Sequence, residues 1–217
     1  MIVPLKQLPP IAIEGHRSSG LGHPEHPMRV VTRRAAGLDA GGWTDGTRRD
    51  VAHYFDELAS EWQSRTSPER TAVVVDAIER GLGALSPQST AVEIGSGTGA
   101  YSALFATRFK TVIAVDLSFE MLRQAPVAPA FRVQADGFAL PLADASLDAV
   151  LLVNAFLFPT EVARVLRPKG TVLWVNSSGE QTPIYLSPED LVAALPGSWT
   201  GVSSRAGEGL WCVVTRD

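Results

Sequence analysis

From residue 91 onward the sequence alternates regularly between short apolar runs and stretches with helical periodicity, and this constrains the fold more than any other feature. The apolar runs are nearly continuous, as is typical of strands buried on both faces of a parallel sheet. Helices between them would cover both faces, so the pattern predicts an α/β fold with a doubly wound, mostly parallel sheet. Strands are expected at residues 91–94, 111–115, 131–135, 148–153 and 171–175, and helices at 100–109, 118–124, 159–166 and 188–195.

The end of the chain departs from this alternation. Two further apolar runs, 199–203 and 210–215, are separated by a loop that contains Gly207 and Gly209. Two runs joined by a short glycine-containing loop indicate an antiparallel hairpin. The sheet is therefore expected to end in antiparallel strands.

The chain before residue 91 divides into two parts. Residues 1–50 are rich in Gly and Pro and show no sustained apolar period, so we predict an irregular arm. An apolar stripe with helical spacing begins at Val51, and Ser67-Pro68 has the composition of a second helix start. The predicted organisation is an arm (1–50), a helical cap segment (51–90) and a ligand-binding core (91–217).

Composition limits the class of protein and its partners. The 217 residues suit one domain with an appendage, and a hydrophobic content of 45% is enough to bury a core. The net charge of −4 argues against nucleic acid or an anionic membrane as a partner held by charge. Cys212 is the single cysteine, and neither a spanning apolar run nor a signal-type apolar core is present, so a cytoplasmic protein is expected.

A glycine-rich loop follows the first predicted strand of the core. The run Glu93-Ile94-Gly95-Ser96-Gly97-Thr98-Gly99-Ala100 has three alternate glycines, which let the backbone turn sharply and approach a ligand closely. The helix behind this loop would offer unpaired amides to a carboxylate or phosphate. The run also satisfies the G-x-G-x-x-A form of a dinucleotide fingerprint, so the loop alone leaves a nucleotide-dependent oxidoreductase open.

Acidic residues stand at the ends of three successive strands. Glu93 precedes the loop, Asp116 closes the second strand 21 residues after Gly95, and Asp136 closes the third and is followed by Gly137. The carboxyl ends of parallel strands meet at one edge of a sheet, where ligands bind, and Asp116 can accept two hydrogen bonds from ribose hydroxyls there. The structural alternatives are that Asp116 caps the following helix and that Asp136 holds a turn.

With these residues the chain resembles the class I S-adenosylmethionine (SAM)-dependent methyltransferases, from about residue 55 to the C-terminus. The resemblance implies a Rossmann-like, mostly parallel seven-stranded sheet with an antiparallel C-terminal strand. It also implies SAM as cofactor and a small-molecule acceptor, because residues 154–159 lack the Asn-Pro-Pro-Tyr-type signature of relatives that methylate amino or amide nitrogen. The motifs that carry the resemblance are residues 92–99, 115–118, 135–137, 147–150 and 161–170.

The resemblance further implies which residues hold the cofactor. The glycine loop would surround the methionine part of SAM, Asp116 would bind the ribose hydroxyls, and Asp136 would accept from the adenine amino group. Backbone carbonyls near Asn154 would face the SAM amino group. The full set implied is Glu93, Gly95, Ser96, Gly97, Gly99, Asp116, Leu117, Asp136, Gly137, Phe138 and Asn154.

The residues that would touch the acceptor are less sharply indicated. Methyl transfer from a sulfonium is an in-line displacement that depends on alignment and a dry cleft, and it needs a base only when the acceptor is protonated. His53, Tyr54 and Tyr185 are the candidates, with solvent exposure or core packing as their alternatives. No metal site is expected, although three histidines of the arm (His16, His23 and His26) invite a zinc interpretation.

Two hypotheses remain beside a small-molecule methyltransferase. One is the nucleotide-dependent oxidoreductase, and the other is a SAM-binding protein without transferase activity. Residues 1–65 are expected to close over the cofactor cleft and to help choose the acceptor, since the sheet from residue 91 onward already supplies every element that holds SAM. Oligomeric state is not predicted.

Overall fold

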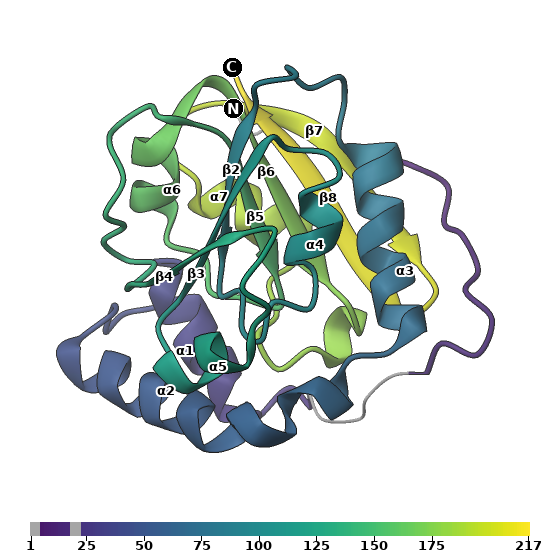
Figure 1. The fold of residues 1–217 in the computed structure, drawn as a ribbon. Helices are drawn as coiled ribbons and strands as arrows, with labels where there is room; N and C mark the ends of the chain where they lie inside the picture. Colours follow the sequence, from purple (N-terminus) through teal and green to yellow (C-terminus); the bar gives the residue numbers. More distant parts are fainter. Residues whose placement is uncertain (1–4, 18–22) are drawn as a thin grey trace.

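The structure, a computed structural model, describes residues 5–17 and 23–217. A single sheet of eight strands forms its centre, in the order β1-β7-β8-β6-β5-β2-β3-β4 (Figure 1). Among the described strands, β8 runs antiparallel to both of its neighbours, and the other pairings are parallel. The strands are β1 (Lys6–Gln7), β2 (Thr90–Ile94), β3 (Thr111–Asp116), β4 (Phe131–Gln134), β5 (Leu147–Val153), β6 (Leu166–Asn176), β7 (Trp199–Ala206) and β8 (Gly209–Arg216).

This topology confirms the predicted Rossmann-like α/β fold with an antiparallel C-terminal hairpin. The strand order reverses beside β2: the chain passes from β2 outward to β3 and β4, then returns to β5 and β6 on the other side. A crevice forms at the carboxyl ends of the strands where the order reverses. That crevice is where the glycine loop and the acidic residues are expected to lie.

Helices cover both faces of the sheet, and the sheet separates two clusters of buried apolar side chains. Leu151 and Leu152 of β5 are both fully buried but point to opposite faces, because successive side chains of a strand alternate. One face is covered by α3 (Pro68–Asp76), η2 (Ala77–Gly81) and α4 (Ser102–Phe105), and the other by α6 (Pro159–Val165) and α7 (Pro188–Ala194).

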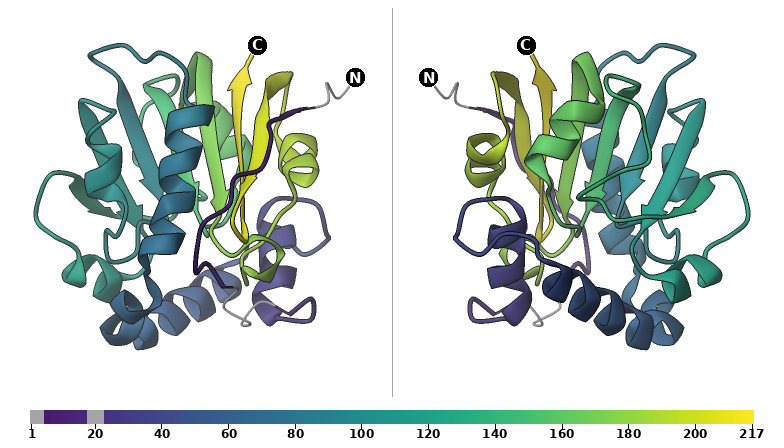
Figure 2. Two further views of the ribbon diagram at one scale, coloured as in Figure 1. Left: turned by 90° about the vertical axis from the view of Figure 1, so that its right-hand side faces the viewer. Right: turned by 90° about the vertical axis from the view of Figure 1, so that its left-hand side faces the viewer.

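A helical layer lies across the carboxyl edge of the sheet, and we call it the cap (Figure 2). It consists of α1 (Pro27–Ala35), α2 (Asp45–Leu58) and the 3₁₀ segment η1 (Ala59–Arg65). Asp56 of α2 joins the cap to α5 (Phe119–Gln124), since its Oδ1 accepts from Ser118 Oγ at 2.5 Å and from the Glu120 amide at 3.2 Å. The cap is therefore held against the strand ends by polar contacts as well as by apolar packing.

Helix α2 already begins at Asp45, within the predicted irregular arm (1–50), and the description of this arm is wrong in two further places. Helix α1 forms in this segment, with His26 Nδ1 as its cap and with Thr32 fully buried. The sequence hides this helix because three arginines interrupt a short apolar stripe, and tertiary packing overrides the weak local signal. The second difference is β1, which pairs with β7 and makes the sheet eight-stranded rather than seven-stranded.

Strand β1 was not predictable because only two residues pair before Pro9 and Pro10 interrupt the strand pattern. Leu8 nevertheless donates its amide to the Ser203 carbonyl at 2.8 Å, and Ile11 donates to the Arg205 carbonyl at 3.0 Å. The segment thus covers the edge of β7, which would otherwise present unpaired backbone groups.

Two predicted core elements also differ in detail. Phe131 of β4 is 66% exposed, so this strand is not buried on both faces as predicted; it forms the edge of the sheet. The helix expected at 100–109 is regular only at Ser102–Phe105 and continues as turns. In both cases the apolar run predicted the correct type of element. For β4 the predicted burial is wrong, and for the helix the predicted length is wrong.

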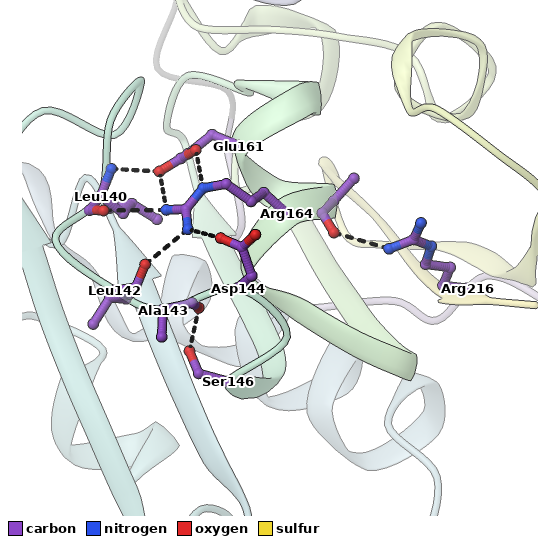
Figure 3. Close-up of polar contacts among 9 residues, drawn as sticks. Leu140, Leu142, Ala143, Asp144, Ser146, Glu161, Arg164 and Arg216 are labelled. Atoms are coloured by element: carbon purple, nitrogen blue, oxygen red, sulfur yellow. Dashed lines mark hydrogen bonds and ion pairs between the residues drawn. The ribbon is translucent and has the colours of Figure 1, made fainter.

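An arginine-centred network fixes the connection between β4 and β5 (Figure 3). Arg164 of α6 donates to both carboxylate oxygens of Glu161, to Asp144, and to the carbonyls of Leu140 and Leu142. These ion pairs raise the pKa of Arg164 above its usual range. Asp144 is therefore structural, and the network steadies the segment that begins at Asp136.

Candidate functional site

A cleft opens between the strand ends and the cap, and it has two ends of different character. We call the part formed after β2, β3 and β4 the charged end, because Glu93, Asp116 and Asp136 all line it. We call the part formed after β5 and β6 the neutral end. Its walls are the side chains of Met28, Trp43, Phe156, Phe158 and Ile184, with the polar groups of His26, Asn154, Ser177, Ser178 and Thr182.

The glycine loop occupies the floor of the charged end as predicted from its spacing. Gly95, Gly97 and Gly99 all have positive φ angles (69°, 55° and 73°), which only glycine adopts without strain. A Cβ on Gly97 would lie 3.3 Å from Trp62 Nε1 across the cleft. Gly95, Ser96 and Gly97 line the cleft, whereas Gly99 lies behind the loop, where a Cβ would meet Ala125 at 3.2 Å.

Asp116 connects the loop to the end of β3. Its Oδ2 accepts from the Gly97 amide at 2.7 Å, and its Oδ1 accepts from the Ser118 amide at 2.8 Å. Burial raises the pKa of Asp116 to about 6, and these amide hydrogen bonds oppose the rise. Asp116 therefore supports the turn into α5, yet each oxygen keeps acceptor capacity toward the cleft. Leu117 lines the cleft beside it.

Glu93 lies deeper, at the end of β2, and is 2% exposed. Burial raises its pKa to about 8, the hydrogen bond from Ser102 Oγ (2.5 Å) opposes the rise, and the nearby Asp116 charge adds to it. Burial therefore favours the protonated form of the Glu93 carboxyl when no cation lies beside it. A ligand that brings a positive charge would favour the ionised form.

Asp136 ends the charged side of the cleft. Its Oδ1 accepts from the Phe138 amide at 2.8 Å and its Oδ2 from the Trp43 indole at 3.0 Å. The Phe138 amide is therefore already engaged, which leaves the amide of Gly137 as the donor toward a ligand. A Cβ on Gly137 would come within 2.9 Å of the Phe158 ring, so close packing requires glycine here.

Asn154 stands between the two ends. It adopts φ of +51° directly after β5, and its side chain is locked: Oδ1 accepts from the Ser177 amide at 2.8 Å and Nδ2 donates to Ser177 Oγ at 2.9 Å. The side chain therefore ties the loops after β5 and β6 together. Its strained backbone lines the cleft beside Ala155.

The three candidates for contact with the acceptor are divided by the structure. Tyr54 lines the cleft from α2, but His53 points outward, with 75% of its side chain exposed and Nε2 lying 3.4 Å from Glu57. Tyr185 is also outside the cleft lining, and its ring lies 4.8 Å beneath the Arg29 guanidinium. Of the three, only Tyr54 is placed to touch a bound molecule.

Several cleft residues were not identified from the sequence, because they come from the segments before residue 91, where no motif marks them. Arg70 of α3 lines the cleft beside the glycine loop, and Arg65 lies 5.4 Å from the Trp62 ring. His26 lines the neutral end, where burial is the main cause of its lowered pKa. A helix-capping pattern could have indicated His26-Pro27 as a helix start, but nothing local indicates that it faces a cleft.

Several further groups lie outside the cleft. Asp148 accepts from the Thr90 amide at 2.7 Å at the opposite edge of the sheet and is structural. Cys212 is fully buried in the core, which raises the pKa of its thiol. Within residues 5–17 and 23–217 no three metal-ligating side chains are grouped, and His16 instead accepts from the Glu208 amide at 3.2 Å. No helix in this part of the chain is long and apolar enough to span a bilayer.

Comparison with known proteins identifies relatives of this chain. Residues 92–174 match a family described as "Methyltransferase domain". A malonyl-[acyl-carrier protein] O-methyltransferase of Pseudescherichia vulneris is 30% identical over 167 residues, 73% of this chain and 61% of that relative. A demethylmenaquinone methyltransferase of Corynebacterium urealyticum is 29% identical over 176 residues, 72% of this chain and 73% of the relative. The chain thus spans about three fifths of the length of the first relative.

Solved structures agree in fold. The DhpI–SAH complex has a TM-score of 0.63 with 22% sequence identity and covers 79% of this chain and 98% of its own. The family match and this likeness in fold support the resemblance of the chain to the class I SAM-dependent methyltransferases. The oxidoreductase that the glycine loop alone left open has no support from these matches.

The residues of the charged end fit SAM, the cofactor of this family. The methionine part carries both an ammonium and a carboxylate, and the cleft offers carboxyl groups at Glu93 and Asp116 and cations at Arg65 and Arg70. Ser96 Oγ is buried and has no hydrogen-bond partner among the described residues, so it is free for a ligand. The positive φ of the loop glycines keeps side chains out of the same space.

Proposed function

We propose that this protein transfers a methyl group from SAM to an uncharged, ring-containing small molecule. The observation that carries the proposal is the distribution of charge along the cleft. Every Asp, Glu and Arg that lines it lies at the charged end or beside the glycine loop, whereas the neutral end is lined by aromatic and aliphatic side chains and neutral polar groups. An acceptor with a carboxylate would lose its hydration there without gaining a cation.

At the charged end, the proposed roles follow the expected order along the sheet edge. Asp116 accepts from the ribose hydroxyls, Asp136 accepts from the adenine amino group and the Gly137 amide meets a ring nitrogen. Glu93 faces the ammonium group, and Arg70, whose Nη1 uses one donor on the Arg65 carbonyl at 2.5 Å, has further donors for the carboxylate.

When bound, SAM supplies a methyl group on a positively charged sulfur. The chain's own contribution is alignment and exclusion of water, which provide much of the rate of such a displacement. Phe156, Phe158 and Ile184 are each less than 10% exposed, so they form a dry wall beside the acceptor. Tyr54 closes the cleft from α2.

His26 supports recognition of an oxygen on the acceptor. Its Nδ1 accepts from the Met28 amide at 3.2 Å, so in the neutral ring the proton resides on Nε2. The lowered pKa keeps the ring neutral. His26 is therefore a hydrogen-bond donor rather than a base, and we expect no protein base: an acceptor hydroxyl reacts only as far as it ionises by itself.

The names of the two relatives suggest how to narrow the acceptor. A neutral, ring-lined wall suits a quinone-type ring, as named in the demethylmenaquinone methyltransferase, better than a malonyl group, as named in the other relative. The acceptor we propose is therefore a small molecule.

We also propose a cytoplasmic location, on the basis of the acidic composition and the single cysteine.

A matched acceptor pair tests the proposal. The protein would be incubated with SAM and either 2-naphthol or 6-hydroxy-2-naphthoic acid, and S-adenosylhomocysteine (SAH) release measured, with SAH binding determined separately by calorimetry. We expect SAH binding and faster turnover of the uncharged naphthol. Faster turnover of the acid would contradict the assignment of the neutral end. SAH binding without turnover across a wider panel of uncharged rings would favour the SAM-binding protein without transferase activity.

A further inference from the structure

Trp43 connects the two ends of the cleft. It lies in the loop between α1 and α2, and its indole Nε1 donates to Asp136 Oδ2 at 3.0 Å. Its ring packs edge-on against Phe158, with 5.0 Å between centroids, and tilted against Phe156 at 5.6 Å. One side chain from the cap thus contacts both the carboxylate after β4 and the aromatic wall after β5.

The Asp136 carboxylate has acceptor capacity to spare. An ionised carboxylate offers about four acceptor positions. Two of them are used, by the backbone amide of Phe138 and by the indole N–H of Trp43, and the others are open. Asp136 also lines the cleft, so its remaining capacity is accessible to a ligand. An amino group of a purine can therefore bind Asp136 while the indole stays in place.

The position of the indole does not depend on that hydrogen bond alone. Trp43 packs against a buried apolar cluster formed by Ala35, Val51, Phe156, Phe158 and Ile184. A ring held by packing on this scale is part of the wall rather than a plug that a ligand would displace. Removing the indole N–H therefore affects the orientation of the carboxylate more than the wall itself.

We infer that Trp43 is a positioning residue that shares Asp136 with the adenine amino group and so couples cofactor binding to the aromatic wall of the acceptor end. The inference rests on the proposed function. Coupling of this kind is reciprocal: if SAM steadies the indole and hence the wall, the acceptor must in turn raise the affinity for SAM. Neither the glycine loop nor the acidic residues at the strand ends predict this contact between the cofactor site and the aromatic wall.

A double-mutant cycle on cofactor binding tests the inference without any acceptor. SAH and S-inosylhomocysteine, in which an oxo group replaces the purine amino group, would be titrated into the wild-type protein and Trp43→Phe. The substitution keeps an aromatic ring and removes the N–H. We expect SAH to bind about three- to tenfold more weakly to the variant, and the inosine analogue to bind both proteins with the same affinity.

Trp62→Phe is the matched control, because Trp62 also lines the cleft but lies beside Gly97 rather than Asp136. It should change the affinities for both ligands by the same factor. Equal factors for Trp43→Phe would overturn the inference, and so would tighter SAH binding to this variant, since that would mean competition for Asp136. If wild-type protein binds no SAH, the proposed function fails first.

A second measurement uses only the wild-type protein, so it does not depend on whether a variant folds. In the wild-type protein, the indole N–H resonance of Trp43 should shift when SAH binds and remain protected from solvent exchange, because the hydrogen bond to Asp136 is kept. Loss of that protection on SAH binding would show displacement of the indole and would contradict the shared carboxylate.

Discussion

The charged and neutral ends of the cleft differ in how they are built and in what they cost. The charged end consists of a loop whose three glycines adopt positive φ without strain, and of two buried carboxyl groups, Glu93 and Asp116, with raised pKa values. The neutral end consists mainly of packed aromatic and aliphatic side chains, and no carboxyl group is among its described lining residues. A site that holds a fixed cofactor thus sacrifices stability for polar complementarity, whereas the wall that selects an acceptor also contributes to the core.

The largest effect is expected at the loop that distinguishes the charged end. Gly97→Val should lower SAH affinity by at least about 100-fold, because a branched side chain is strained at φ of +55° and would project toward Trp62. Gly197→Val is the control, since Gly197 has φ of +95° with open space around it and lies outside the cleft lining. Calorimetry on both variants separates backbone strain from blockage, and a Gly97→Val protein with normal affinity would refute the loop assignment.

The cost of the charged end should appear as a pH-dependent stability. Glu93 has its pKa raised from 4.5 to about 8 by burial, so its contribution is fully present below pH 4.5 and is lost as the pH rises toward 8. Glu93→Gln removes this loss, and the variant should gain on the order of a few kcal/mol over wild type above pH 8 and little near pH 4.5. Denaturant unfolding across this range measures the difference, and a pH-independent difference would disprove the buried-acid explanation.

The cofactor contact of Asp116 should be smaller but specific. Asp116→Asn is expected to weaken SAH binding about 10- to 30-fold, because the neutral amide loses charge-assisted acceptor capacity toward the ribose hydroxyls. In the wild-type protein the affinity should also fall as the pH drops below about 6, where the carboxylate is protonated. Asp148→Asn, at the opposite sheet edge, serves as control. Unchanged calorimetric affinity in Asp116→Asn would leave this residue with a purely structural role.

A cation placed at the neutral end should reduce the preference of that end for uncharged acceptors. Met28 lines that end and is only partly buried, so a lysine there can reach water. Met28→Lys is expected to improve turnover of the carboxylated naphthol relative to 2-naphthol by about tenfold, with SAH affinity unchanged. Met28→Gln controls for polarity without charge. If both variants shift the preference equally, charge is not what the neutral end discriminates.

The smallest effects are expected outside the cleft. His53→Ala and Tyr185→Phe should change kcat/KM for the acceptor by less than about twofold, because neither side chain lines the cleft. Tyr54→Phe, on the same helix as His53, should have the larger effect if the hydroxyl contacts the acceptor. A tenfold loss of kcat/KM in His53→Ala would instead indicate that this histidine acts as a base.

The two ends also differ in how far the sequence predicts them. The charged end follows from local patterns: a strand that runs into Gly95-Ser96-Gly97, and acidic residues at the ends of consecutive strands, which parallel topology brings together. The neutral end depends on residues of the arm and cap, such as Met28 and Trp43, which no local motif marks. Their placement is fixed by tertiary packing on Phe156 and Phe158, which no local period encodes.

The predicted role of residues 1–65 as a cover over the cleft has support in the placement of α1, α2 and η1, which supply several lining residues. Deleting residues 1–45 would not test that role cleanly. The deletion would remove Thr32 and Ala36, which are buried, along with β1, and would therefore reduce stability as well as catalysis. Point substitutions on the cap, such as those at Trp43 and Tyr54, isolate the functional part.

A crystal structure of the SAH complex tests most directly whether the two ends divide the work as proposed. We predict that both ribose hydroxyls lie about 3 Å from the Asp116 carboxylate, that the adenine amino group meets Asp136 beside the Trp43 indole, and that the sulfur faces the residues from Asn154 to Phe158. A purine seated among Met28, Phe156 and Ile184, with the homocysteine directed away from the glycine loop, would contradict the division of the cleft.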